Sequence, residues 1–240
     1  MTEKTEQYQI RKGRTEIDVP HKDSDLTFVY EKHGPGTYAN VASSIGKAGL
    51  SQPTMAETAS FLHPVFTAKE EQPEFNEIKQ LMRSNWLWAF TGSLYTPKGV
   101  YVQDNPAIKD GMPYMNESEL VKKLEANDPS VRFVPNGFNI GEMSTIELAK
   151  NAYVKALAGD EGADKLAEIA DKHKNKPYLW ALKDVGKQET RVSALNSYWD
   201  VGHWLVVCGY IHGYYRYSCA FGVRKGGIGT VGSDASRAKK

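Results

Sequence analysis

The chain has 240 residues, and its 30 Lys and Arg against 29 Asp and Glu leave a net charge of +1 at pH 7. Such a balance creates no field that would gather nucleic acid or anionic lipid, so neither is expected as a partner. The sequence has no apolar stretch long enough to cross a bilayer, its polar start lacks a signal-peptide core, and its two cysteines make no disulfide framework, so we expect neither membrane insertion nor ordinary secretion.

The first third of the chain reads as a polar start followed by one strand and three helices. Residues 1–25 are polar and are expected to be a loosely ordered extension. Apolar residues alternate over 26–30, which is typical of a strand. A short helix is predicted at 38–48, the capping-box spacing of Thr54 and Glu57 opens a second, and a third at 74–84 carries its apolar residues on one face.

A β-hairpin is predicted next. Residues 87–95 and 100–103 have strand character, and they flank the tetrapeptide Thr-Pro-Lys-Gly at 96–99. Proline and glycine at these places suit a tight turn, because proline presets one backbone angle and glycine accepts conformations that other residues avoid.

The middle of the chain is helical. Residues 118–126 have helical character, the spacing of Ser144 and Glu147 forms another capping box, and a further helix is predicted at 161–174. Strand character returns at 178–182. Because no Gly-, Pro- or Ser-rich linker bounds this segment, we interpret it as an insertion within one domain.

The expected organisation is therefore an α+β chain with one main domain at 26–225, between the polar start and a flexible tail at 226–240. The helical insertion occupies about 112–176, and an unusual region occupies about 196–219. By default the protein is expected in the cytoplasm, or displayed on a cell or virus surface through a partner.

The composition of residues 191–224 is strongly biased. This window contains no Lys, Glu, Gln or Met, although these four types make up roughly a fifth of the chain. It holds five of the 13 tyrosines, two of the 5 tryptophans and both cysteines. Buried strands have a related composition, but they alternate apolar and polar residues or run continuously apolar. The scattered His, Asp, Arg and Ser of this window show no consistent period of two, and its Tyr, Ser, Gly and His content is similar to an antibody paratope.

The genetic code offers a cause for this bias. Lys, Glu, Gln, Met and Trp are the amino acids that no codon ending in C or T can specify. Every residue between Ser193 and Cys219 except Trp199 and Trp204 can be reached by changing the first two bases of such a codon. The pattern indicates a mutational process acting on a fixed scaffold, and only a recognition surface gains from such variation.

The same third of the chain carries a family likeness. Arg-Val at 191–192, Ser-Tyr-Trp at 197–199 and Phe-Gly-Val-Arg at 221–224 resemble the final strands of the C-type lectin fold, in the subtype of formylglycine-generating enzyme. Together with the codon bias, the chain resembles the variable proteins of diversity-generating retroelements, most of all the archaeal ones. In that family a reverse transcriptase copies a template with errors at adenines, so that AAC and AAT codons change to others ending in C or T.

This resemblance implies a division of the window into scaffold and displayed residues. The scaffold set is Arg191, Val192, Trp199, Trp204, Leu205, Gly209, Gly213, Ala220, Phe221, Gly222 and Val223. The displayed, variable set, which would bind an unknown macromolecular ligand, most simply a protein, is Tyr198, Asp200, Val201, His203, Val206, Cys208, Tyr210, Ile211, His212, Tyr214, Tyr215, Tyr217 and Ser218. No cofactor is implied. Relatives of this fold include single and trimeric arrangements, so the oligomeric state stays open.

Two enzymatic alternatives remain. Formylglycine-generating enzymes use paired cysteines, and Cys208 and Cys219 lie in the corresponding third, although farther apart than in that family. Cys208, His212, His203 and Asp200 are also capable metal ligands, but their spacing matches no structural zinc pattern. The phrases that calcium-dependent sugar-binding lectins require are incomplete here, so carbohydrate binding does not follow from the fold.

Overall fold

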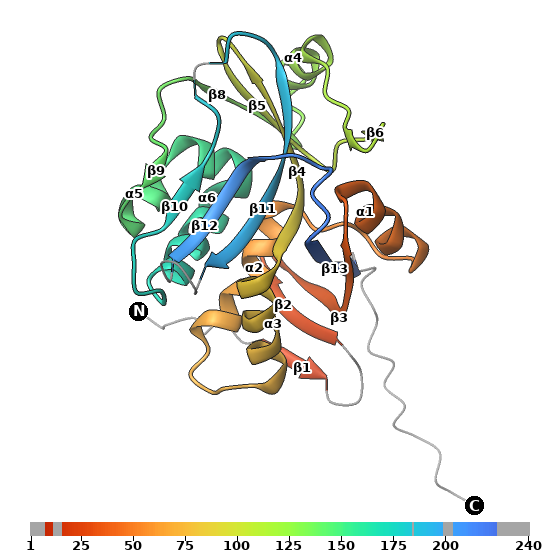
Figure 1. The fold of residues 1–240 in the computed structure, drawn as a ribbon, viewed down its shortest axis with the longest axis vertical. Coiled ribbons are helices and arrows are strands. Elements are labelled where there is room, and N and C mark those ends of the chain that lie inside the picture. Colours follow the sequence, from red (N-terminus) through yellow and green to blue (C-terminus); the bar gives the residue numbers. More distant parts are fainter. Residues whose placement is uncertain (1–7, 12–15, 184, 199–203, 225–240) are drawn as a thin grey trace, which may run out of the picture.

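The computed structural model describes residues 8–11, 16–183, 185–198 and 204–224. In these ranges the helices are α1 (Tyr38–Lys47), α2 (Met55–Thr67), α3 (Pro73–Ser84), α4 (Glu117–Glu125), α5 (Thr145–Lys150) and α6 (Ala152–Ala170). The strands are β1 (Gln9–Arg11), β2 (Glu16–His21), β3 (Ser24–Gly36), β4 (Trp86–Thr96), β5 (Gly99–Asp104), β6 (Ile108–Lys109), β7 (Met112–Pro113), β8 (Val131–Pro135), β9 (Gly141–Glu142), β10 (Tyr178–Trp180), β11 (Glu189–Tyr198), β12 (Trp204–Ile211) and β13 (Ser218–Arg224). Figure 1 shows their arrangement.

One large sheet organises the molecule. Among the described residues it has eleven strands, with the main order β1-β2-β3-β13-β4-β11-β12-β10-β9 and with β5 and β8 continuing from β4. The last strand, β13, lies inside the sheet, antiparallel to β3 and parallel to β4. β11 pairs antiparallel with both β4 and β12, and β10 lies parallel to β12. The biased window therefore supplies three interior strands.

The two faces of this sheet are covered differently. On one face α2, α3 and α6 pack over the largest core cluster, which includes Leu195, Leu205 and Val207. On the other face α1 contributes to a second core cluster with Trp86 and Trp88. Figure 1 shows α1 at the side of β3 and β13, while β11 and β12 lie toward the viewer with no helix in front of them. A large part of the second face is therefore left to side chains and loops to cover.

Local signals in the sequence set several of these elements. The predicted capping box of α2 is present: Thr54 N–H donates to Glu57 Oε2 at 2.7 Å, and Glu57 N–H donates to Thr54 Oγ1 at 3.2 Å. Ser144 and Glu147 form the second predicted box, at the start of α5. The predicted hairpin is β4–β5, whose register joins Thr96 to Gly99.

Two expectations about the organisation need correction. Residues 16–25 are not a loose extension, because β2 and the start of β3 pair with each other and both Ile17 and Val19 are buried in the main core. The helix predicted at 161–174 corresponds to the second part of α6, which follows a break at Gly159, where φ is 74°, and ends at Ala170. Because α6 packs on α2 and β8 extends the sheet, much of the helical segment belongs to the shared core.

Candidate ligand-binding surface

Strand β12 alternates cleanly between the two faces of the sheet. Trp204, Val206 and Cys208 belong to the second core cluster, whereas Leu205 and Val207 belong to the main one. The expectation that the window lacks a period of two is therefore wrong for this strand. Both faces are covered there, so apolar residues occupy both sets of positions and hide the alternation. Polar residues of the window such as His212 and Arg216 fall in the following loop, outside the strands.

The loop at 212–217 and the end of β12 expose a group of aromatic side chains. Nine large hydrophobic side chains of the described residues are exposed, and four lie here: Tyr210 at 38%, Tyr214 at 60%, Tyr215 at 41% and Tyr217 at 67%. The rings of Tyr215 and Tyr217 meet with centroids 5.8 Å apart. Exposed aromatic residues gathered in one place are typical of a recognition site, since water is released from them on binding.

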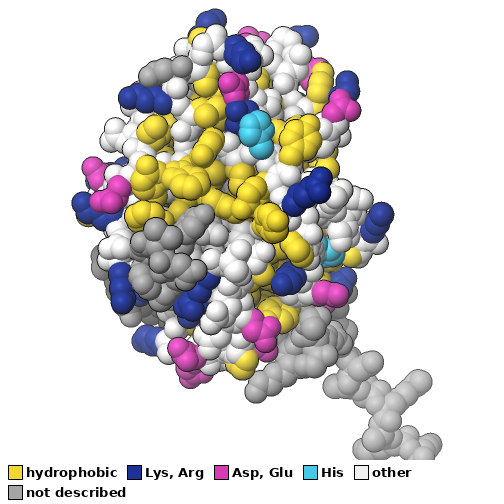
Figure 2. Space-filling view, viewed as in Figure 1, with side chains coloured by type: hydrophobic (Ala, Val, Ile, Leu, Met, Phe, Trp, Pro, Cys, Tyr) yellow, Lys and Arg dark blue, Asp and Glu magenta, His cyan; other side chains and the backbone are white. Residues whose placement is uncertain are grey.

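Aromatic residues of β10 and β12 continue this surface. Trp180 approaches Tyr210 at 5.9 Å between ring centroids, Tyr178 approaches Trp180 at 6.0 Å, and Trp204 approaches Tyr178 at 5.9 Å. We call the following set the aromatic face: Tyr178, Trp180, Trp204, Tyr210, His212, Tyr214, Tyr215 and Tyr217. Figure 2, in the orientation of Figure 1, shows a broad hydrophobic patch across the middle of this side of the molecule.

The backbone of the loop is held by groups that do not depend on its displayed side chains. Tyr38 N–H donates to Gly213 O at 2.9 Å, and Trp86 N–H donates to Tyr217 O at 3.3 Å. At Gly213 an added Cβ would lie 2.8 Å from Met112 Sδ and 3.0 Å from Gly111 O. Glycine is therefore required at position 213, because a side chain there would push the loop away from the β6–β7 hairpin.

Gly209 is a second position within the window where the surrounding packing requires glycine. Tyr95 Oη donates to Gly209 O at 2.8 Å, and Tyr153 Oη donates to the same oxygen at 3.2 Å. Burial raises the pKa of both tyrosines, so their hydroxyls remain protonated donors. An added Cβ at Gly209 would lie only 2.0 Å from Tyr153 Oη. The hydrogen bond from Tyr153 to Gly209 O thus fixes β12 to α6, directly behind the aromatic face.

The described part of the displayed set divides into two groups. Six residues are exposed or partly exposed: Tyr210, Ile211, His212, Tyr214, Tyr215 and Tyr217. Three are buried, and their expected display is corrected: Val206, Cys208 and Ser218. Val206 and Cys208 point into the second core cluster, and Ser218 lies in register beside Trp86, so aromatic side chains cover all three. The remaining four are Tyr198, Asp200, Val201 and His203. The last three lie outside the described residues, as does the side chain of Tyr198.

Six of these window residues line a hollow of about 390 Å³ together with one residue from elsewhere, Trp180. The window residues are Cys208, Tyr210, Ile211, His212, Tyr214 and Tyr215. The pairing of β10 with β12 places Trp180 beside Cys208 in register. Trp180, Tyr178 and Trp86 were missed by the sequence reasoning, because the signal for strand character at 178–182 does not say which strand β10 joins.

The two cysteines cannot form a joint site. Cys208 belongs to the second core cluster and Cys219 to the main one, so they face opposite sides of the sheet. Their strands are separated by β4 and β11, a distance of roughly 14 Å at the usual strand spacing. Burial raises the pKa of each thiol to about 12, so both are neutral near pH 7. Among the described residues no group of three His, Cys, Asp or Glu could hold a metal ion.

Among the described residues, a polar cluster between β2, α2 and α6 comes nearest to a catalytic arrangement. His21 Nδ1 lies 2.9 Å from Ser60 Oγ, and Lys165 Nζ donates to the same hydroxyl at 3.1 Å. Burial is the main cause that lowers the pKa of His21. However, Lys165 is paired with Glu161 at 2.7 Å, and Ser60 lies inside a helix, where its backbone N–H is used by the helix. We therefore interpret these contacts as joining β2, α2 and α6 in the fold.

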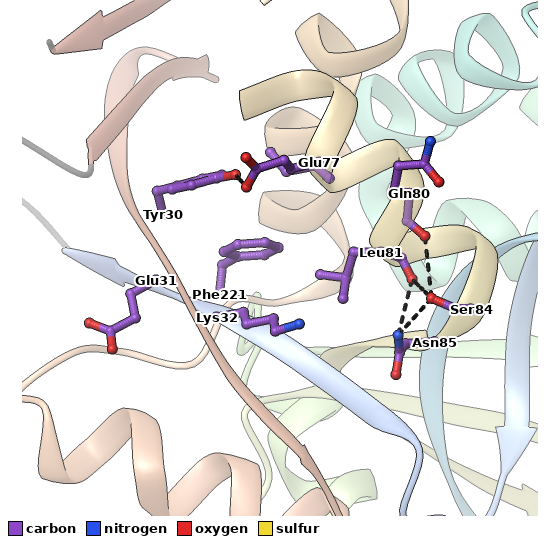
Figure 3. Close-up of a pocket in the computed structure, with 10 residues that line it drawn as sticks. Tyr30, Glu31, Lys32, Glu77, Gln80, Leu81, Ser84, Asn85 and Phe221 are labelled. Carbon is purple, nitrogen blue, oxygen red and sulfur yellow. Dashed lines mark hydrogen bonds between the residues drawn. The ribbon is translucent and has the colours of Figure 1, made fainter. Parts of the chain in front are cut away.

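A larger hollow of about 680 Å³ lies on the helix-covered face of the sheet, between β3, β13 and α3 (Figure 3). Phe221 and Leu81 form its apolar part, and Tyr30 Oη donates a short hydrogen bond to Glu77 at its edge. Burial and the carboxylate of Glu77 raise the pKa of Tyr30. None of the residues that line this hollow belongs to the aromatic face, and the two lie on opposite sides of the sheet, so they are separate sites.

Comparisons with known proteins identify the fold. No family model and no curated protein matches the chain. One solved structure, described as the accommodation of massive sequence variation in Nanoarchaeota by the C-type lectin fold, matches 85% of this chain and 100% of its own, with a TM-score of 0.54 and 15% sequence identity. The chain therefore has a C-type lectin fold, as the final strands predicted. No helix in the described ranges is long and apolar enough to span a membrane.

Proposed function

We propose that this chain is a recognition protein that binds a protein ligand through the aromatic face, and that a diversity-generating retroelement varies the side chains of that face. One observation carries the proposal. The exposed residues of the window gather on one surface, while the backbone beneath them is fixed by Gly209 and Gly213. Display and support are therefore provided by different residues.

The chemistry of the face supports binding to a protein. Tyrosine and tryptophan offer a large contact area with few rotatable bonds, so little conformational entropy is lost when they are buried. Such residues dominate the binding energy of protein interfaces. The face also carries polar hydroxyl and imidazole groups at Tyr214, Tyr217 and His212, which can hydrogen-bond to a partner.

The support of the loop also favours diversification. Tyr214 makes one side-chain hydrogen bond to the rest of the protein, from its hydroxyl to Asp110 O at 3.0 Å, and most other loop contacts are made by the backbone. Exchange of the exposed side chains should therefore cost little stability. The solved structure of the same fold is described in terms of massive sequence variation, which is the property proposed here.

The oxidase alternative is not favoured, because Cys208 and Cys219 face opposite sides of the sheet and both thiols are buried. A dithiol reaction needs two sulfur atoms that approach each other and at least one thiolate.

Selection from a display library tests the proposal. Codons ending in C or T would be randomised at five exposed positions of the aromatic face: Tyr210, His212, Tyr214, Tyr215 and Tyr217. A control library would randomise five exposed positions on and beside α4: Ser118, Glu119, Lys122, Glu125 and Ala126. Both would be selected against purified lysozyme, streptavidin and ubiquitin. We expect folded binders from the face library and few from the control. Equal yields from the two libraries, or none from the first, would contradict the proposal.

A further inference from the structure

We infer that Trp180 is a constant ligand contact within this variable surface, where its indole forms one wall of a hollow that receives an aromatic or branched aliphatic side chain of the partner protein. The inference rests on the proposed function and adds a fixed subsite to it. In this view every variant of the protein uses the same apolar anchor point, and the surrounding residues decide which partner is accepted.

The lining of the hollow supports an apolar occupant. Trp180 forms it together with Cys208, Ile211, His212 and the tyrosines around them, and among the described residues no carboxylate, ammonium or guanidinium group lines it. A charged side chain that entered would lose its water without gaining an ionic partner, which is costly. Cys208 is fully buried and presents an uncharged sulfur beside the indole. The volume of about 390 Å³ gives room for a whole side chain.

Residues outside the biased window hold the indole in place. The rings of Trp180 and Trp86 have centroids 5.6 Å apart, and Tyr178 meets Trp180 nearly edge-on, at an interplanar angle of 87°. Trp86 is buried on β4, and Tyr178 precedes Trp180 on β10. Side chains outside the window therefore support the orientation of Trp180, in addition to its contact with Tyr210.

The codon rule explains why a constant tryptophan at this position would be useful. A process that yields only codons ending in C or T cannot produce tryptophan, although tryptophan is among the most effective residues at protein interfaces. The variable positions can supply tyrosine, as they do at Tyr210, Tyr214 and Tyr215. An indole in this hollow has to come from a residue outside the process, and Trp180 is the residue that lines it.

The test uses binders selected from the face library against lysozyme. Trp180→Ala would be introduced into several independent binders, and Phe133→Ala, which removes an aromatic ring exposed by 37% on the distant β8, would serve as the matched control. We expect Trp180→Ala to weaken Kd by about 30-fold or more in most binders, as for a central aromatic contact. Phe133→Ala should leave Kd unchanged.

Thermal unfolding of each variant separates a lost contact from a lost fold. If Trp180→Ala unfolds, Trp180→Phe takes its place and should weaken binding in the same direction, because the smaller ring fills less of the hollow. Binders that keep their Kd after these substitutions would overturn the inference while leaving the proposed function intact. A face library that yields no binders would instead contradict the proposed function itself.

Discussion

The substitution Gly209→Ala tests whether β12 is held from behind by its backbone. The added Cβ would lie 2.0 Å from Tyr153 Oη, 2.7 Å from Cζ and 2.8 Å from Cε1 of the same ring. These distances are far inside van der Waals contact, so either the strand or the ring has to move. The Tyr153 ring is stacked on Phe138 with centroids 4.8 Å apart, and the side chain is fully buried. Neither partner can move without a loss of packing.

The cost follows from the hydrogen bonds that such a movement would break. Tyr153 Oη lies 2.7 Å from both Ser93 Oγ and Tyr95 Oη, in addition to its contact with Gly209 O. Overpacking costs typically 1–3 kcal/mol and each buried polar group left unpaired about 1–3 kcal/mol, so we expect the free energy of unfolding to fall by about 3–5 kcal/mol. For a chain of this size, Tm should fall by roughly 10 °C.

Thermal and urea unfolding would measure this change, with His212→Ala as the control because its side chain is exposed just beyond the same strand. The control should change stability by less than about 0.5 kcal/mol. In the Gly209→Ala background, Tyr153→Phe should be less harmful than in the native protein, because it removes the oxygen that the new methyl group meets. A loss below about 1 kcal/mol for Gly209→Ala, or no coupling with Tyr153→Phe, would refute the reasoning.

Three further predictions concern stability. The triple substitution of Tyr214, Tyr215 and Tyr217 to Ala should abolish binding in a selected binder while calorimetry finds Tm within a few degrees; a collapse of Tm would mean that these rings belong to the core. The hydroxyl of Ser218 is buried and has no hydrogen-bond partner among the described residues, so Ser218→Ala should leave the free energy of unfolding unchanged or raise it by about 1 kcal/mol in urea titrations, and a clear loss would contradict this. Burial lowers the pKa of His21 from 6.5, so the folded chain binds fewer protons than the unfolded chain, and stability should fall as pH falls below 6.5. His21→Gln should flatten that dependence, and an unchanged slope would exclude His21 as its source.

Much of the fold could be predicted from local signals. Capping residues such as Thr54 and Ser144 placed helix starts, and the Pro-Gly turn placed the β4–β5 hairpin. The family phrases at the end of the chain predicted the fold class. The pairing of strands was out of reach, because it depends on contacts between distant residues. β2 was missed for a related reason: Ile17 and Val19 are single apolar residues within a polar stretch, and only their pairing with β3 buries them.

The site was predicted in part. The tyrosines at 214–217 are exposed as expected, because they lie in a loop whose turn is fixed by Gly213. Val206 and Cys208 have the same codon signature but lie on the strand, where the aromatic rings cover them. The amino-acid composition indicates which positions are compatible with the proposed codon process, whereas exposure depends on the face to which a residue points. Trp180 gave no such signal, since its part in the surface arises from the pairing of β10 with β12.

Deep sequencing of this gene in a natural population of its host tests the central claim most directly. The account predicts that amino-acid differences gather in the codons of Tyr210, His212 and the tyrosines at 214–217, that these codons end in C or T, and that Gly209 and Trp180 are constant. Differences spread evenly along the chain, or a face identical in every copy, would contradict it.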